Sequence, residues 1–115
     1  MSRRVDKPWG YELIWAETPG YVGKILHIGK GQSLSLQYHR VKDETIFVQS
    51  GSLILELENE KGEIEKMTLA AGESRRILPG RRHRMTGDTD VDVLEASTNH
   101  LDDVVRLEDR YGRVP

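Results

Sequence analysis

The stretch Gly31-Gln-Ser-Leu-Ser-Leu-Gln-Tyr-His-Arg-Val-Lys-Asp-Glu44 decides the fold of this chain. From Ser33 to His39, polar and apolar residues alternate with the period of two that is typical of a β-strand. We expect the polar side of this strand to line a cavity. We expect its leucine side to pack on another sheet, for which a second subunit is one source.

The same period of two continues on both sides of this stretch. Short alternating segments recur between turns that contain glycine, which predicts an all-β fold, either a sandwich or a barrel. The expected strands cover residues 11–15, 21–28, 33–39, 44–49, 52–58, 64–69, 75–78 and 91–97. Only residues 102–111, DDVVRLEDRY, are expected to form a short helix.

Length and composition limit the classes of function. The chain has 115 residues, so we expect residues 1–115 to form a single domain. A formal net charge of −2 argues against a nucleic-acid partner, and the lack of cysteine excludes disulfides and thiolate metal sites. The sequence shows no secretory signal and no apolar run of membrane-spanning length, so we expect a cytoplasmic protein without a membrane partner.

Four side chains stand at spacings that a metal ion explains: Gln37, His39, Glu44 and His83. Gln37 and His39 are two residues apart on one expected strand, so they point to the same side. Glu44 would begin the next strand, and His83 comes from a later one. Two imidazoles, a carboxylate and an amide oxygen suit one divalent ion, zinc first, with manganese, iron, nickel or cobalt as alternatives. Taken singly, each histidine also fits an ordinary polar position at a strand end.

The glycines around these residues complete the spacing of a known family. Residues 31–51 resemble the first cupin motif, G-x5-H-x-H-x4-E-x6-G, and the only departure is Gln37 at the first histidine. Residues 72–87 resemble the second motif, G-x5-P-x-G-x2-H-x3-N, with Pro79 one place late and Gly87 where asparagine is usual. The resemblance implies the double-stranded β-helix of cupins, a jelly-roll-like barrel, here with a short C-terminal segment.

Two further segments resemble the cupin domain of bifunctional mannose-6-phosphate isomerases, which is otherwise fused to a mannose-1-phosphate guanylyltransferase. Residues 7–11, KPWGY, look like its R-P-W-G-x-Y/F segment, and residues 102–113, DDVVRLEDRYGR, look like its D-D-I/V-V-R-x-x-D-R-Y-G-R. That domain also has glutamine at the position of Gln37. The resemblance implies a metal-dependent isomerase that interconverts mannose 6-phosphate and fructose 6-phosphate, and we expect a homodimer.

Such a reaction needs a group that moves a proton and a site that holds the phosphate. Lys24 is the candidate for proton transfer, at a place where the family also has lysine. Arg81, Arg84 and Arg110 are the candidates for phosphate binding, because a guanidinium can hold a phosphate through two hydrogen bonds. For Lys24, Arg81 and Arg84 the alternative is a solvated position on the surface. For Arg110 the alternative is a structural clasp of the C-terminal tail with Asp109 and Tyr111.

Two other functions stay open. Residues 38–45 read YHRVKDET where the family usually reads M-H-H-H-R-A-E-H, so fewer acid–base groups are present. A non-catalytic cupin that binds a metal and a small sugar-like ligand is therefore the first alternative. Another cupin metal enzyme, an epimerase or a dioxygenase, is the second, because a fold does not determine the reaction.

Overall fold

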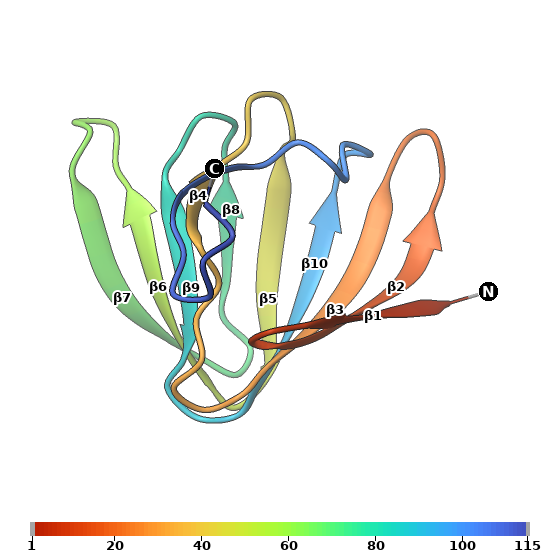
Figure 1. Cartoon of the computed structure of the whole chain (residues 1–115), viewed down its shortest axis with the longest axis horizontal. Helices are drawn as coiled ribbons and strands as arrows, with labels where there is room; N and C mark the ends of the chain where they lie inside the picture. The colour runs from red at the N-terminus through yellow and green to blue at the C-terminus, as the bar shows by residue number, and fades with distance from the viewer. Residues whose placement is uncertain (1, 115) are drawn as a thin grey trace.

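Two antiparallel sheets face each other in the computed structural model, which describes residues 2–114 (Figure 1). One sheet has the strand order β1-β2-β3-β10-β5-β8, and the other has the order β11-β4-β9-β6-β7. The strands are β1 (Arg3–Lys7), β2 (Gly10–Glu17), β3 (Val22–Ile28), β4 (Leu36–Tyr38), β5 (Glu44–Ser50), β6 (Ser52–Glu58), β7 (Ile64–Ala70), β8 (Ser74–Ile77), β9 (His83–Gly87), β10 (Val91–Ser97) and β11 (Val105–Glu108). Residues 2–114 contain no helix, so the all-β jelly-roll-like fold expected from the sequence is confirmed.

The apolar core fills one part of the interior, and polar side chains fill another part. In the first sheet, Leu26, Val93 and Val48 are cross-strand neighbours, and all three are buried. Lys24 lies two residues before Leu26 on β3, and Glu95 lies two residues after Val93 on β10, so both share the inward face. Lys24 and Glu95 lie opposite each other and are also buried. The alternation that builds the core therefore also places charged side chains inside, where they need partners.

The strand expected at residues 33–39 is shorter and less regular than predicted. Ser33 bridges to Thr86, and Gln37 pairs with His83. The four residue steps from Ser33 to Gln37 therefore lie opposite only three steps from Thr86 to His83. The extra residue acts as a β-bulge and reverses the side-chain alternation. Leu34 consequently belongs to the core and lines the cavity on the side where Gln37 lies, which corrects the expected division into a polar and a leucine face.

The helix expected at residues 102–111 is wrong, because β11 occupies the middle of this segment. Val105 pairs with Tyr38 and Arg106 with Gln37, so β11 supplies hydrogen bonds to the free edge of β4. Neighbouring β-branched residues, Val104 and Val105, fit an extended backbone better than a helix. Pairing with a distant strand therefore outweighs the helical pattern of the local sequence.

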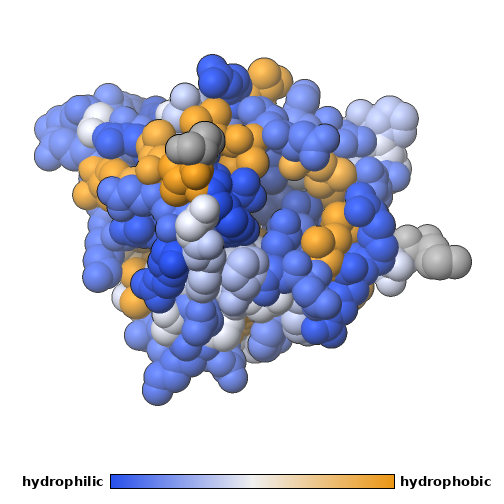
Figure 2. All heavy atoms as spheres, viewed as in Figure 1, coloured by the Kyte–Doolittle hydropathy of each residue, from blue (hydrophilic) through white to orange (hydrophobic). Residues whose placement is uncertain are grey.

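β1, the edge strand of the first sheet, and the C-terminal segment lie nearest the viewer in Figure 1. The C-terminal segment is held by Tyr111, whose hydroxyl bonds to the side chain of Gln32 and accepts from the Ser33 amide. Figure 2 shows that this face of the molecule is mostly hydrophilic, with apolar side chains in separate patches. Among the described residues, no helix has the length and apolarity to cross a membrane.

Candidate metal centre

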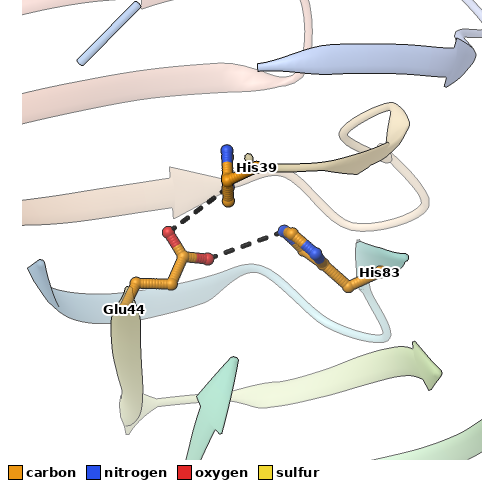
Figure 3. A group of neighbouring side chains, drawn as sticks. All are labelled: His39, Glu44 and His83. Atoms are coloured by element: carbon orange, nitrogen blue, oxygen red, sulfur yellow. Dashed lines mark ion pairs between the residues drawn. The ribbon is translucent and has the colours of Figure 1, made fainter. Parts of the chain in front are cut away.

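His39, Glu44 and His83 converge in the interior (Figure 3). Glu44 is the first residue of β5, His83 is the first residue of β9, and His39 directly follows β4. One oxygen of Glu44 lies 3.6 Å from His39 Nε2, and the other lies 3.6 Å from His83 Nε2. The three side chains are 4%, 2% and 1% exposed, so solvent does not satisfy their polar atoms.

The atoms that face one another in this cluster lack hydrogen-bond partners. Within residues 2–114, the Nε2 atoms of His39 and His83 and both oxygens of Glu44 are buried without a hydrogen bond of good geometry. Lys42 Nζ lies 3.0 Å from one of these oxygens and forms an ion pair with it. Buried polar atoms left in this way are costly, and four of them on three side chains from different parts of the chain suit a shared cation. The residues present therefore fit a divalent metal ion.

Backbone carbonyls hold both imidazoles in the orientation that metal binding needs. His39 Nδ1 donates to the carbonyl of Asp103, and His83 Nδ1 donates to the carbonyl of Arg81 over 2.9 Å. Because a carbonyl can only accept, the proton of each neutral ring sits on Nδ1 and the lone pair on Nε2 points into the cluster. Such partners of the ligands fix the tautomer and the ring plane.

Burial also sets the protonation of the cluster. It lowers the pKa of His39 and of His83, which favours the neutral imidazoles that can bind a metal. Burial, together with the charge of Glu95, raises the pKa of Glu44, and Lys42 and His83 oppose that shift. A bound divalent cation would stabilise the ionised form of Glu44.

Gln37 lies beside the cluster, on the cavity wall that also carries His39. It is the direct cross-strand neighbour of His83, and residues opposite each other in an antiparallel pair share one face of the sheet. Its Oε1 accepts a hydrogen bond from Ser35 Oγ over 2.6 Å, which orients the amide. The structure thus places Gln37 on the cavity wall and opposite His83 in the sheet.

A chain of alternating charges leads away from the cluster. Lys42 Nζ lies 3.0 Å from Glu44 and 3.1 Å from Glu95, and all three side chains are buried. Burial opposes the charge on Lys42, but the charges of Glu95 and Glu44 outweigh it and raise the pKa of Lys42. Burial also opposes ionisation of Glu95, but the charges of Lys42 and Lys24 lower its pKa. Lys42 and Glu95 are therefore ionised and neutralise each other, and Glu44 lies at the end of the chain.

A cavity of about 460 Å³ opens beside this chain, between β1, β2 and β3 on one side and β4, β11 and the C-terminal segment on the other. Lys24 lies on its wall, where its ammonium group is 3.4 Å from the carboxylate of Glu12. The charged and polar residues on the wall are Arg3, Lys7, Glu12, Glu17, Lys24, Gln37, His39, Lys42, Asp102, Arg106 and Arg113. The wall carries more cationic than anionic side chains, so the cavity suits an anionic ligand.

The structure places the three arginines expected to bind phosphate away from the wall of this cavity. Arg84 lies on the other face of β9, where it contacts Glu56 and Glu108 at 2.6 and 3.5 Å. Arg81 donates to the carbonyl of Glu58, and Arg110 donates to the carbonyl of Gly31. Each guanidinium already has a partner within the chain.

Sequence reasoning missed three residues that support the centre. Glu95 could have been found, because it occupies the inward phase of β10 with Val91 and Val93, where a charged residue is unusual. Lys42 lies in a loop, where periodicity carries no signal. Asp103 accepts hydrogen bonds from the backbone amides of residues 40–42, which lowers its pKa to about 2, and only the tertiary structure brings these segments together.

Comparisons with known proteins agree with this architecture. A family model described as a cupin domain matches residues 24–97. The mannose-1-phosphate guanylyltransferase ManC of Salmonella typhimurium is 37% identical over 120 residues, and the xanthan biosynthesis protein XanB of Xanthomonas campestris is 34% identical over 117 residues. These matches cover 99% and 96% of this chain but only 24% of either relative, so the chain spans about a quarter of their length.

Solved structures show the same fold at low sequence identity. A structure of the oxalate decarboxylase of Bacillus subtilis, determined for work on its Mn(II) centres, superposes with a TM-score of 0.80 at 13% identity. The match covers 99% of this chain and 32% of that chain. At this identity the similarity supports the fold alone.

Proposed function

This chain belongs to the cupin family, and from that premise we propose that it is a metal-dependent isomerase that interconverts mannose 6-phosphate and fructose 6-phosphate. The observation that carries the proposal is the set of unsatisfied ligand atoms of His39, Glu44 and His83 beside a cavity rich in lysine and arginine. The resemblance of residues 7–11 and 102–113 to the isomerase domain of the bifunctional enzymes narrows the substrate to a mannose phosphate.

Gln37, His39, Glu44 and His83 would hold one divalent ion, for which zinc is our first choice and manganese, iron, nickel and cobalt are alternatives. When bound, such an ion acts as a Lewis acid for the negative charge that develops on the sugar oxygens O1 and O2. The protein contributes the fixed imidazole tautomers and a buried carboxylate.

The isomerisation moves one proton from C2 to C1 and one between the oxygens, and it leaves no net change in oxidation state. We assign the proton transfer to Lys24 together with Glu12, because this ion pair lies on the cavity wall. A carboxylate can accept the C2 proton and return it to C1, while the ammonium group holds the carboxylate in place. Lys42 is held protonated by Glu44 and Glu95, so it provides a fixed positive charge rather than a base.

The missing histidines of the family motif do not count against this proposal. They would stand at the positions of Arg40, Val41 and Thr45, and all three residues are exposed. Thr45 is next to Glu44 on β5 and therefore points to the opposite face of its strand. Their replacement therefore leaves the residues on the cavity wall unchanged.

A coupled assay with mannose 6-phosphate tests the function. The protein is first analysed for bound metal and then assayed as purified, after chelation and after addition of single metal ions. We expect activity to fall on chelation and to return with one ion. The matched control is His83→Ala, which should stay inactive whatever ion is added. No turnover by protein that carries one ion per chain would refute the isomerase and favour the non-catalytic sugar-binding cupin.

The homodimer and the cytoplasmic location stay predictions. Sedimentation velocity at micromolar protein concentration tests the first, and cell fractionation tests the second.

A further inference from the structure

We propose that Arg106, on β11, is the anchor of a phosphate-binding subsite at the cavity wall and that Lys7, on β1, completes it from the opposite wall. This inference rests on the proposed function, whose substrate is a sugar phosphate. It replaces neither the metal ligands nor Lys24, and it assigns the anion to a part of the cavity that they do not occupy.

Arg106 differs from the other arginines on the cavity wall in its hydrogen bonding. Its Nε atom is buried, and within residues 2–114 it has no hydrogen-bond partner. A buried guanidinium nitrogen that donates to nothing is costly, so an acceptor is expected from outside the chain. Because the side chain lines the cavity, a ligand in the cavity can supply that acceptor.

The nearest carboxylate does not fill this role. Asp109 is close enough for the charge of Arg106 to contribute to lowering its pKa. However, both oxygens of Asp109 accept hydrogen bonds from the guanidinium of Arg113, at 2.8 and 2.9 Å. Arg113 therefore neutralises Asp109, and the charge of Arg106 is left for another anion.

Within the part of the chain that the structure describes, three other cations on the wall are also engaged, whereas Lys7 is not. Arg3 contacts Glu17 at 3.0 Å, and Lys24 contacts Glu12 at 3.4 Å. Lys42 bridges two buried glutamates. Lys7 lines the cavity, and no acidic side chain among residues 2–114 lies within ion-pair distance of it. A phosphate monoester carries a charge of roughly −1.5 to −2, which one arginine fork and one lysine can balance.

Register places this subsite at a useful distance from the metal centre. Arg106 is the cross-strand neighbour of Gln37, and Gln37 is the cross-strand neighbour of His83. The three residues thus form one row on the inner face, and two strand spacings separate Arg106 from His83, which is about 10 Å. A sugar whose C1 and C2 oxygens lie at the metal centre can reach this row with a phosphate at its far end.

Binding of fructose 6-phosphate and of unphosphorylated fructose, measured by calorimetry on metal-loaded protein, tests the subsite. We expect the natural sequence to prefer fructose 6-phosphate. Arg106→Gln should weaken its affinity about 10- to 100-fold, as expected when a charge-assisted hydrogen bond is lost, without changing the affinity for fructose. Arg106→Lys should recover part of the loss, because it keeps the charge without the fork. Arg75→Gln, an exposed arginine on β8, is the matched control and should change neither affinity.

The outcomes separate the subsite from the isomerase. If Arg106→Gln melts like the natural sequence and keeps its full preference for fructose 6-phosphate, the subsite is refuted even where turnover of mannose 6-phosphate is found. No preference in the natural sequence would refute it as well. If the preference exists and is lost in Arg106→Gln while no turnover occurs, the subsite stands and the isomerase does not.

Discussion

The two faces of β9 carry neighbouring residues that differ in whether their polar atoms have partners within the chain. His83 points inward, is 1% exposed, and leaves its Nε2 atom without a hydrogen-bond partner. Arg84, the next residue, points outward and makes charge pairs with Glu56 and Glu108. On the outer face the charge of Arg84 is paired within the chain, whereas on the inner face the Nε2 atom of His83 has no hydrogen-bond partner among residues 2–114.

This difference distinguishes a structural charge from a functional one. A protein interior tolerates unsatisfied polar atoms poorly, so a cluster of them at one place indicates a ligand that completes it. Surface pairs such as Arg84 with Glu56 need no such explanation. For phosphate binding, the sequence favoured Arg81, Arg84 and Arg110, whereas the pattern of satisfied and unsatisfied atoms favours Arg106.

The strongest test of this comparison is to replace His83 and Arg84 by alanine in two separate variants. We expect His83→Ala to lose metal binding altogether, because loss of a ligand exceeds the roughly 10- to 100-fold loss caused by removing a partner of a ligand. Arg84→Ala, the matched control on the outer face, should keep the affinity of the natural sequence. Calorimetric titration with zinc measures both, and full metal occupancy of His83→Ala would remove it from the ligand set.

The buried charges of Lys42, Glu44 and Glu95 lie inside the protein next to the metal ligands. Lys42→Met leaves Glu95 and Glu44 buried without their cation, so we expect the free energy of unfolding to fall by about 3–5 kcal/mol. Urea denaturation of metal-loaded protein measures the change. Adding Glu95→Gln should restore part of the loss, and Lys66→Met, at an exposed position of β7, is the control. A loss below about 1 kcal/mol would show that the chain of charges is not coupled.

Asp103 tests whether the centre depends on its support. Its carboxylate holds the backbone amides of residues 40–42, and its carbonyl holds His39. We expect Asp103→Ala to lower zinc affinity by about 10- to 100-fold with all ligands present. Asp88→Ala, an exposed aspartate in the turn after β9, should leave it unchanged. Equal zinc affinities of the two variants would mean that residues 40–42 do not need the Asp103 carboxylate to support the metal centre.

The Asp109–Arg113 clasp should contribute less, and its contribution should depend on pH. Hydrogen bonds from Arg113 lower the pKa of Asp109 to about 2, below the ordinary value of 3.8. A group with a lowered pKa stabilises the fold above the unfolded value and loses that effect as the pH falls toward the folded value. Asp109→Asn should therefore lower the free energy of unfolding by about 1–2 kcal/mol at pH 7. The difference between the variant and the natural sequence should become smaller between pH 4 and pH 2. A gap that stays constant over this range in denaturation experiments would contradict the assignment.

The smallest effect is expected on the outer face. Arg84→Gln should change the free energy of unfolding by less than about 1 kcal/mol, because partly exposed ion pairs contribute little. Raising the salt concentration should reduce the difference further. A larger loss of unfolding free energy, or weaker binding of fructose 6-phosphate, would show that Arg84 has a functional role.

The parts that sequence reasoning recovered are those that short-range spacing determines. The strand start expected at Glu44 is confirmed, because period-two alternation and turn glycines are local signals. His83 begins β9, which none of the expected strand ranges covers. Leu34 lies on the other face from the one expected, since nothing in residues 33–39 reveals the extra residue opposite Thr86 and His83. Residues 102–111 contain a strand where a helix is expected, since the edge of β4 that this strand completes lies more than sixty residues away in the sequence.

By itself, the sequence determined the all-β class, most of the strands, the absence of cysteine chemistry, and the residue types that can bind a divalent ion, because these follow from composition and spacing. Only the tertiary structure decided which charges are neutralised within the chain and which are left for a ligand. Lys42 with Glu95, Arg84 with Glu56 and the unpartnered Nε of Arg106 all depend on neighbours that are distant in sequence. Electrostatic and hydrogen-bond energies act over a few ångströms in space, so the fold must bring residues together before their roles differ.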